Sequence, residues 1–150
     1  MRKKESGAMI RREQQNQPRY MTLIMDMIER MGLSEGMAKI FEDNGFGAAT
    51  ASIEAFDGST YRLFISAFAT GVIDVEVSKK ISPQDDPFRH FTLLKAINEL
   101  NKEADGLTYY LDDQVISVKT TCRTGWDADI AYQHLMATMS AAVSSFPNFE

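Results

Sequence analysis

The sequence predicts an α+β fold in which an antiparallel sheet is built in the order helix, three or four strands, helix, two strands, helix. Three observations predict it. Apolar residues recur at helical spacing in three segments, turn dipeptides divide the chain between those segments into short pieces, and apolar and polar side chains alternate within the pieces. With 150 residues, 44% of them hydrophobic, the chain suits one domain with its own core, and neither a repeat nor a second domain is visible.

The first 19 residues are predicted to be a basic tail, and residues 20–150 the single domain. The tail carries six basic and two acidic side chains, which give it a net charge of +4, whereas the whole chain carries −5. The domain is therefore strongly acidic and repels phosphate backbones, which disfavours nucleic acid as a partner except through the tail. The polar composition of the tail favours a solvated arm, although a basic element that docks on the domain or on a partner stays open.

The first helix is predicted to begin near Pro18 and to end at Gly32. Its apolar residues follow the i, i+3, i+4, i+7 series of one helical face: Tyr20, Leu23, Ile24, Met27, Ile28 and Met31. Proline is tolerated in the first turn, where its missing N–H costs nothing, and glycine adopts the left-handed conformation that ends many helices.

Methionines cluster in and just after this first helix: Met21, Met25, Met27, Met31 and Met37. Methionine fills gaps in protein cores, and it also forms adaptable surfaces that receive varied peptide segments. The sequence leaves both interpretations open. On the second interpretation, Met27 and Met31 are candidate partner-binding residues.

Three or four antiparallel strands are predicted between residues 37 and 79. The turns between them are marked by Asn44-Gly45, Asp57-Gly58 and Gly71. After the second turn, one face of a strand carries Tyr61, Leu63, Ile65 and Ala67. Phe64 and Phe68 lie on the opposite face, which becomes an apolar patch in need of a partner if nothing covers it. Phe64 and Phe68 are therefore candidate partner-binding residues.

The second helix is predicted from Pro87 to Ala104. Asp86 can cap its first turn, and Pro87 can occupy its first position. Its buried side is expected to consist of Phe88, Phe91, Leu94, Ile97 and Leu100. Asp105-Gly106 then ends the helix and opens a second hairpin, whose two strands alternate on either side of Asp112-Asp113.

The third helix is predicted to follow Asp127, which can cap it. Its apolar stripe consists of Ala131, Leu135, Met139, Ala142, Val143 and Phe146. Between Asp129 and Glu150 the sequence contains no charged residue, although its polar side chains disfavour a membrane span. A surface helix normally carries charge on its outer face. We therefore expect this helix to pack on two sides, either within the fold or across a subunit interface.

No pattern in the sequence dictates a reaction, so no catalytic, cofactor-binding or metal-binding residue is assigned. Six positions after Cys122, where the loop of a cysteine phosphatase has arginine, the chain has Ala128. His90 and His134 form no i, i+4 ligand pair, and Asp127 with Asp129 is explained by helix capping. A small hydrolase or transferase that uses Cys122 or the two aspartates remains the alternative to a protein without catalytic activity.

A cytoplasmic location is expected. The single cysteine cannot form an internal disulfide and suits a reducing compartment. No apolar run reaches the roughly 18 residues that cross a bilayer, and the basic N-terminus is not followed by the apolar stretch of a secretion signal.

The second half of the chain resembles a known family. The segment Leu93–Asn101, the strands at Thr108–Asp113 and Val115–Val118, and the closing apolar helix are similar to the YbjN-type bacterial sensory transduction regulator family. The fold of that family is similar to the fold of the type III secretion chaperones. The resemblance covers roughly residues 20–146 and implies helices on one side of an antiparallel sheet, a homodimer and no catalytic site. It assigns no functional residues, and we interpret Asn98 and Asn101 as structural residues that tie the second helix to the next hairpin.

Together these observations predict a cytoplasmic, non-enzymatic and homodimeric protein that binds a segment of another protein, as a chaperone-like or regulatory adaptor. No cofactor is expected, and neither a membrane nor nucleic acid is the expected partner. The candidate partner-binding residues are Phe64, Phe68, Met27 and Met31. A structural dimer whose tail contacts nucleic acid is a third possibility.

Overall fold

The computed structural model describes residues 17–33, 36–55, 57–82 and 86–149, so nearly all of the predicted tail lies outside the described residues. The helices are α2 (Arg19–Arg30), α3 (Pro87–Glu103) and α4 (Ala128–Ser145), and a 3-10 turn, η1 (Phe146–Phe149), follows α4. The strands are β1 (Ala38–Asp43), β2 (Phe46–Glu54), β3 (Thr60–Phe68), β4 (Val72–Lys80), β5 (Thr108–Asp112) and β6 (Val115–Arg123). The predicted order of helices and strands is confirmed, with four strands in the first group.

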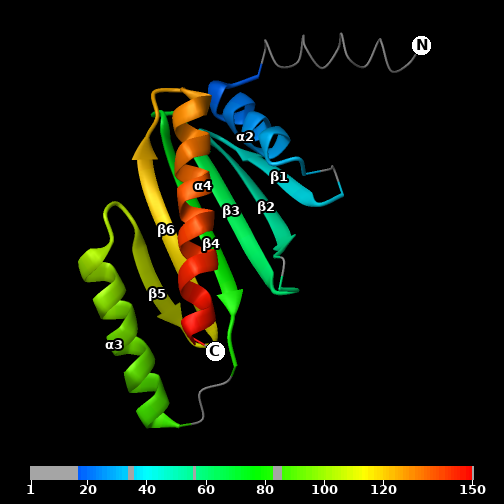
Figure 1. Ribbon diagram of the computed structural model, residues 1–150. Helices are drawn as coiled ribbons and strands as arrows, with labels where there is room; N and C mark the ends of the chain where they lie inside the picture. The colour runs from blue at the N-terminus through cyan, green and yellow to red at the C-terminus, as the bar shows by residue number, and fades with distance from the viewer. Residues whose placement is uncertain (1–16, 34–35, 56, 83–85, 150) are drawn as a thin grey trace.

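The six strands form one antiparallel sheet in the order β1-β2-β3-β4-β6-β5 (Figure 1). The first four strands are a meander, as predicted. The second hairpin joins the sheet through β6, which pairs with β4, so that β5 becomes the edge. The fold is therefore α+β, with β1 at one edge of the sheet and β5 at the other.

The ends of α2 follow from Pro18 and Gly32. The Pro18 carbonyl accepts hydrogen bonds from the backbone N–H groups of Met21 and Thr22, at 3.0 and 3.2 Å, and so begins the helix just before its first residue. Gly32 has φ +72°, and its N–H donates to the Glu29 carbonyl while the next N–H donates to the Ile28 carbonyl. This pair of hydrogen bonds is the Schellman motif, which glycine favours because it lacks a Cβ.

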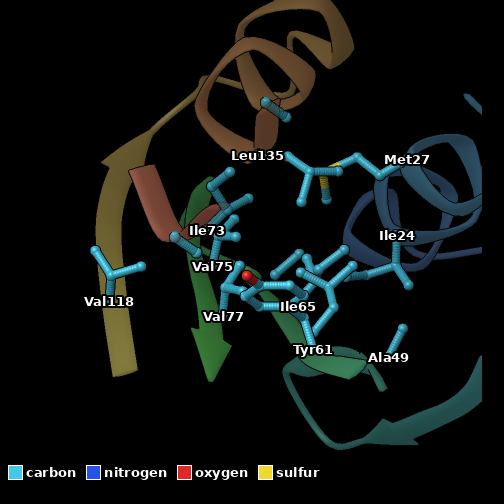
Figure 2. Close-up of a cluster of buried hydrophobic side chains, with 14 of the residues drawn as sticks. Ile24, Met27, Ala49, Tyr61, Ile65, Ile73, Val75, Val77, Val118 and Leu135 are labelled. Atoms are coloured by element: carbon cyan, nitrogen blue, oxygen red, sulfur yellow. The ribbon is translucent and has the colours of Figure 1, made fainter. Parts of the chain in front are cut away.

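Helices α2 and α4 cover one face of the sheet (Figure 1), and the core lies between them and the strands. Figure 2 shows Met27 of α2 and Leu135 of α4 lying above Ile73 and Val75 of β4. On its covered face, β2 carries the small residues Gly47, Ala49 and Ala51 before Ile53. A Cβ at Gly47 would overlap the sulfur of Met21, so the glycine allows α2 to lie close against the sheet.

Helix α3 lies beside the edge strand β5 (Figure 1) rather than on a face of the sheet. Asp86 caps it, as predicted, by accepting a hydrogen bond from the Phe88 N–H at 3.0 Å. The prediction of its buried side was wrong for three residues: Phe88, Phe91 and Leu94 are exposed. The buried residues are Leu93 and Ile97, with Leu100 half-buried. A helix that contacts a single edge strand buries only a narrow strip, which explains the difference.

Helix α4 begins at Asp127, whose carboxylate accepts hydrogen bonds from the backbone N–H groups of Asp129 and Ile130, at 2.9 and 3.3 Å. Four residues of the predicted stripe are fully buried: Ala131, Leu135, Ala142 and Phe146. Val143 is 47% exposed, so its predicted burial was wrong. No described segment covers the uncharged outer face of α4, where Met136 and Val143 lie, so packing on two sides does not occur within the described part of the chain.

Candidate partner-binding surface

The face of the sheet opposite α2 and α4 carries no described helix. We call this surface the open face. Phe64 points to the open face, because the neighbouring residues Leu63 and Ile65 of β3 are buried beneath the helices. The register aligns one row across five strands: Lys39, Thr50, Phe64, Glu76 and Lys119. Phe64 thus stands between a threonine and a carboxylate at the middle of a six-stranded surface.

Aromatic side chains gather on the β1–β3 part of the open face. Phe46 and Phe68 are directly opposite in the register, and their ring centroids are 5.9 Å apart. Phe41 on β1 is 52% exposed and Phe64 is 38% exposed. Phe46 and Phe68 are each half-buried, because part of each ring rests on the other. The open face therefore presents accessible aromatic surface that no described segment of the chain covers.

Two hollows lie on the open face, and Arg62 of β3 lines both. The first, of about 510 Å³, lies toward the β1 edge and is also lined by Met37 and Phe41. The second, of about 290 Å³, lies toward β5 and is also lined by Phe64, Glu76, Tyr110 and Val115. Both linings mix apolar and polar side chains: the first hollow also has Lys39, Thr50 and Ser52, and the second also has Ser78, Asp112 and Ser117. Such linings suit a peptide segment that brings polar as well as apolar side chains across the strands.

The four candidate partner-binding residues do not lie together. Phe64 and Phe68 are on the open face, whereas Met27 lies on α2 and Met31 directly follows α2, on the other side of the sheet. Met27 is fully buried in the core and Met31 is half-buried against it, so Met27 has no surface to offer to a partner in this structure. The helical spacing that predicted α2 already placed Met27 on its apolar stripe, and the gap-filling interpretation agrees with its position.

Sequence reasoning missed Phe41, Arg62, Tyr110 and Val115 as residues of the open face. A signal for Phe41 was present, because the Asn44-Gly45 turn fixes its register opposite Ala48. The sequence gives less indication that Tyr110 and Val115 lie on the open face. Their place on the same face depends on β6 pairing with β4, which local patterns do not specify.

A further hollow, of about 530 Å³, lies on the opposite side of the molecule beside the C-terminal half of α4. It is lined mostly by apolar side chains, among them Ile53, Tyr61, Met139 and Val143. Asp57 lies at this hollow, and the Ser59 N–H donates a hydrogen bond to its carboxylate at 2.9 Å. That hydrogen bond lowers the pKa of Asp57, so the carboxylate remains charged at neutral pH.

The residues of the alternative, catalytic hypothesis have structural roles. Asp127 caps α4, and Asp129 accepts a hydrogen bond from the Arg30 guanidinium at 2.7 Å, which raises the pKa of Arg30. Cys122 is half-buried on the side of the sheet that the helices cover. Within the described ranges, no group of three histidine, cysteine, aspartate or glutamate residues could hold a metal ion. No specific observation therefore favours a hydrolase or a transferase.

No family model matches the chain, and no curated protein matches it. Among the described helices, none is long and apolar enough to cross a membrane. Solved structures similar to this one include a crystal structure of YbjN and a chaperone-effector complex. The crystal structure of YbjN from E. coli has a TM-score of 0.46 and 12% sequence identity, over 83% of this chain and 91% of that chain.

The second similar structure is a chain of the HopA1-SchA chaperone-effector complex. Its TM-score is 0.44 and its sequence identity 17%, over 81% of this chain and 88% of that chain. The two kinds of protein named by the sequence resemblance are thus found among the similar structures. The likenesses extend over most of each chain, and neither assigns a role to a residue of this one.

Proposed function

We propose that this protein is a non-enzymatic binding module that holds a segment of another protein, its client, against the open face. The observation that carries the proposal is the position of Phe64, an exposed aromatic residue at the centre of a sheet face without a described helix. Chaperone-like and regulatory adaptors share this requirement, because both hold a partner chain. A cytoplasmic location is part of the proposal.

The physical basis is burial of aromatic surface between two hollows. A client segment that crosses β3 at Phe64 could place one side chain in each hollow, where apolar and polar groups are both available, and it would cover the Phe64 ring. Interfaces gain most of their affinity from a few such central aromatic and arginine residues. Arg62 lines both hollows and offers donors to the carbonyl groups of a peptide backbone.

Replacing Phe64 with aspartate is expected to weaken client binding by at least about tenfold, because a carboxylate at the centre of the contact must be desolvated without a partner. The measurement is a pull-down with the tagged full chain from a lysate of the organism that encodes it, with quantitative mass spectrometry of the bound proteins. Phe68 is left intact, since its ring packs on Phe46 and its loss would disturb the sheet.

The matched control is Phe88→Asp, the same chemical change on α3, where the side chain is 76% exposed. The control variant is expected to bind the same proteins as the unmodified chain. Circular dichroism and urea unfolding of both variants verify that they fold. Equal loss of binding in the two folded variants, or undiminished binding with Phe64→Asp, would contradict a client site on the open face.

A further inference from the structure

The hollow that Ile53, Tyr61, Met139 and Val143 line takes no part in the proposed client site, and we call it the α4 hollow. It lies on the side of the sheet that the helices cover, so a client segment on the open face does not reach it. Its volume of about 530 Å³ is within the range of small-molecule sites, roughly 300 to 1,000 Å³. Such sites are mostly apolar and contain a few placed polar groups, and the lining of the α4 hollow fits that description.

Apolar side chains from β2 and α4 form the walls of the α4 hollow, and Tyr61 of β3 lies at its base. Tyr61 is buried and stacks on Phe146, with ring centroids 6.0 Å apart, so the core holds the base in place. Ile53 and Met139 are half-buried, and Val143 is exposed with no described segment over it. An apolar ligand in the hollow would remove this surface from water, which is favourable.

The rim of the α4 hollow carries two carboxylates, Glu54 at the end of β2 and Asp57 in the turn that follows. Both residues are exposed, and no lysine or arginine of the described ranges forms an ion pair with either of them. The Asp57 carboxylate is oriented by the Ser59 N–H, which donates a hydrogen bond to it at 2.9 Å. The rim therefore offers negative charge to a ligand that carries a cationic group.

A buried cation, Lys79, lies behind the α4 hollow and does not line it. Its Nζ donates a hydrogen bond to the Ser59 Oγ at 3.4 Å and lies 5.6 Å from the centroid of the Tyr61 ring. The hydrogen bond from the Ser59 N–H and, to a smaller extent, the Lys79 charge lower the pKa of Asp57. Two carboxylates and one ammonium leave a net negative charge around the hollow, which favours a cation over an anion.

We propose that the α4 hollow binds a small molecule with an apolar body and one cationic head group, the chemistry of a primary aliphatic amine. The apolar body lies against Ile53, Met139 and Val143, and the ammonium lies at the rim beside Glu54 and Asp57. Burial of apolar surface supplies the affinity, and charged hydrogen bonds to the carboxylates orient the ligand. The proposal does not depend on the client, because the hollow and the open face are on opposite sides of the sheet.

The first test titrates the full chain, labelled with carbon-13 in its methionine methyl groups, with octylamine and separately with octanoate. Binding is expected to shift the Met139 methyl resonance, which the variant Met139→Leu assigns, and to leave that of Met136 on the outer face of α4 unchanged. Octylamine is expected to bind about tenfold more tightly than octanoate at low salt. No shift of the Met139 resonance at millimolar octylamine, or equal affinities for the two probes, overturns the proposal.

The second test removes the charges of the rim and preserves its shape, with the double variant Glu54→Gln and Asp57→Asn. The side-chain oxygen at position 57 can still accept the hydrogen bond from the Ser59 N–H, so the turn is expected to keep its structure. The variant is expected to bind octylamine and octanoate with affinities within about twofold of each other. A preference for octylamine that persists in the folded variant overturns the assignment of the cationic head to this rim.

The third test fills the hollow with Val143→Trp and uses Met136→Trp as the matched control on the same helix. Circular dichroism and urea unfolding verify that both variants fold. Val143→Trp is expected to abolish octylamine binding and to leave the capture of client proteins unchanged, and the control is expected to change neither. Loss of client proteins from Val143→Trp alone would assign the hollow to a polypeptide and overturn the proposal. Phe64→Asp is expected to leave octylamine binding unchanged, so failure of the client site and failure of this site are distinguishable.

Discussion

Replacing Leu135 with alanine is expected to lower the free energy of unfolding by about 2 to 5 kcal/mol, the range for removing a fully buried leucine side chain. Leu135 has no solvent exposure, and α4 contacts α2, β4 and β6. Figure 2 shows its side chain beside Met27 and above the β4 residues Ile73 and Val75. The truncation therefore leaves a cavity at the point where two helices and the sheet meet.

The control for this prediction is Met136→Ala, one position further along the same helix. Met136 is 44% exposed on the outer face of α4, so its truncation is expected to change the free energy of unfolding by less than about 1 kcal/mol. Urea denaturation of both variants, followed by circular dichroism, measures the two values. Equal destabilisation of the two variants would contradict the orientation of α4 on the sheet.

Replacing Asn101 with alanine is expected to cost about 2 to 3 kcal/mol, because two hydrogen bonds are lost and both backbone groups of Tyr109 lose their partner. The Asn101 amide joins α3 to the edge strand β5 through contacts of 2.7 and 2.9 Å. Of the apolar side chains of α3, Leu93 and Ile97 are buried, whereas Phe88 and Phe91 face solvent. The loss should therefore loosen α3 and β5 before the rest of the sheet, and hydrogen exchange of the β5 amides should accelerate.

Asn98→Ala is the matched control for Asn101→Ala. Asn98 lies on the same helix but is exposed, so its replacement is expected to change stability by about 0.5 kcal/mol or less. Urea unfolding and amide hydrogen exchange are measured for both variants. A loss of similar size in Asn98→Ala, or none in Asn101→Ala, would contradict the role of Asn101 as the link between α3 and the sheet.

The local structure of this chain follows from short-range rules that the sequence displays directly. Gly32 ends α2 because its left-handed φ suits the Schellman motif, and Asp86 and Asp127 cap the two later helices. Alternation of side chains placed Phe64 and Phe68 on the face opposite the core. The tie from the second helix to the next hairpin, predicted for Asn98 and Asn101, is confirmed for Asn101 by its two hydrogen bonds to Tyr109. Asn98 is exposed on the same helix, and no described hydrogen bond gives it this role.

The remaining features depend on long-range packing, which local patterns do not encode. Phe88 and Phe91 were predicted to be buried because they share an apolar side of α3, yet that helix meets only the edge of the sheet. The pairing of β6 with β4 likewise brings Tyr110 and Val115 to the second hollow. Alternation identified the face that carries Phe64, but only the placement of the three helices shows that no described helix covers it.

The central claim, that the open face holds a client at Phe64, is tested most directly by photo-cross-linking. A p-benzoylphenylalanine residue is placed at position 64 of the full chain, and in a separate variant at position 88, where it also replaces a phenylalanine. Irradiation in the native cells is expected to give a discrete adduct from position 64, which mass spectrometry identifies as another protein, and none of that adduct from position 88. The same adduct from both positions, or its formation from position 88 alone, would contradict the account.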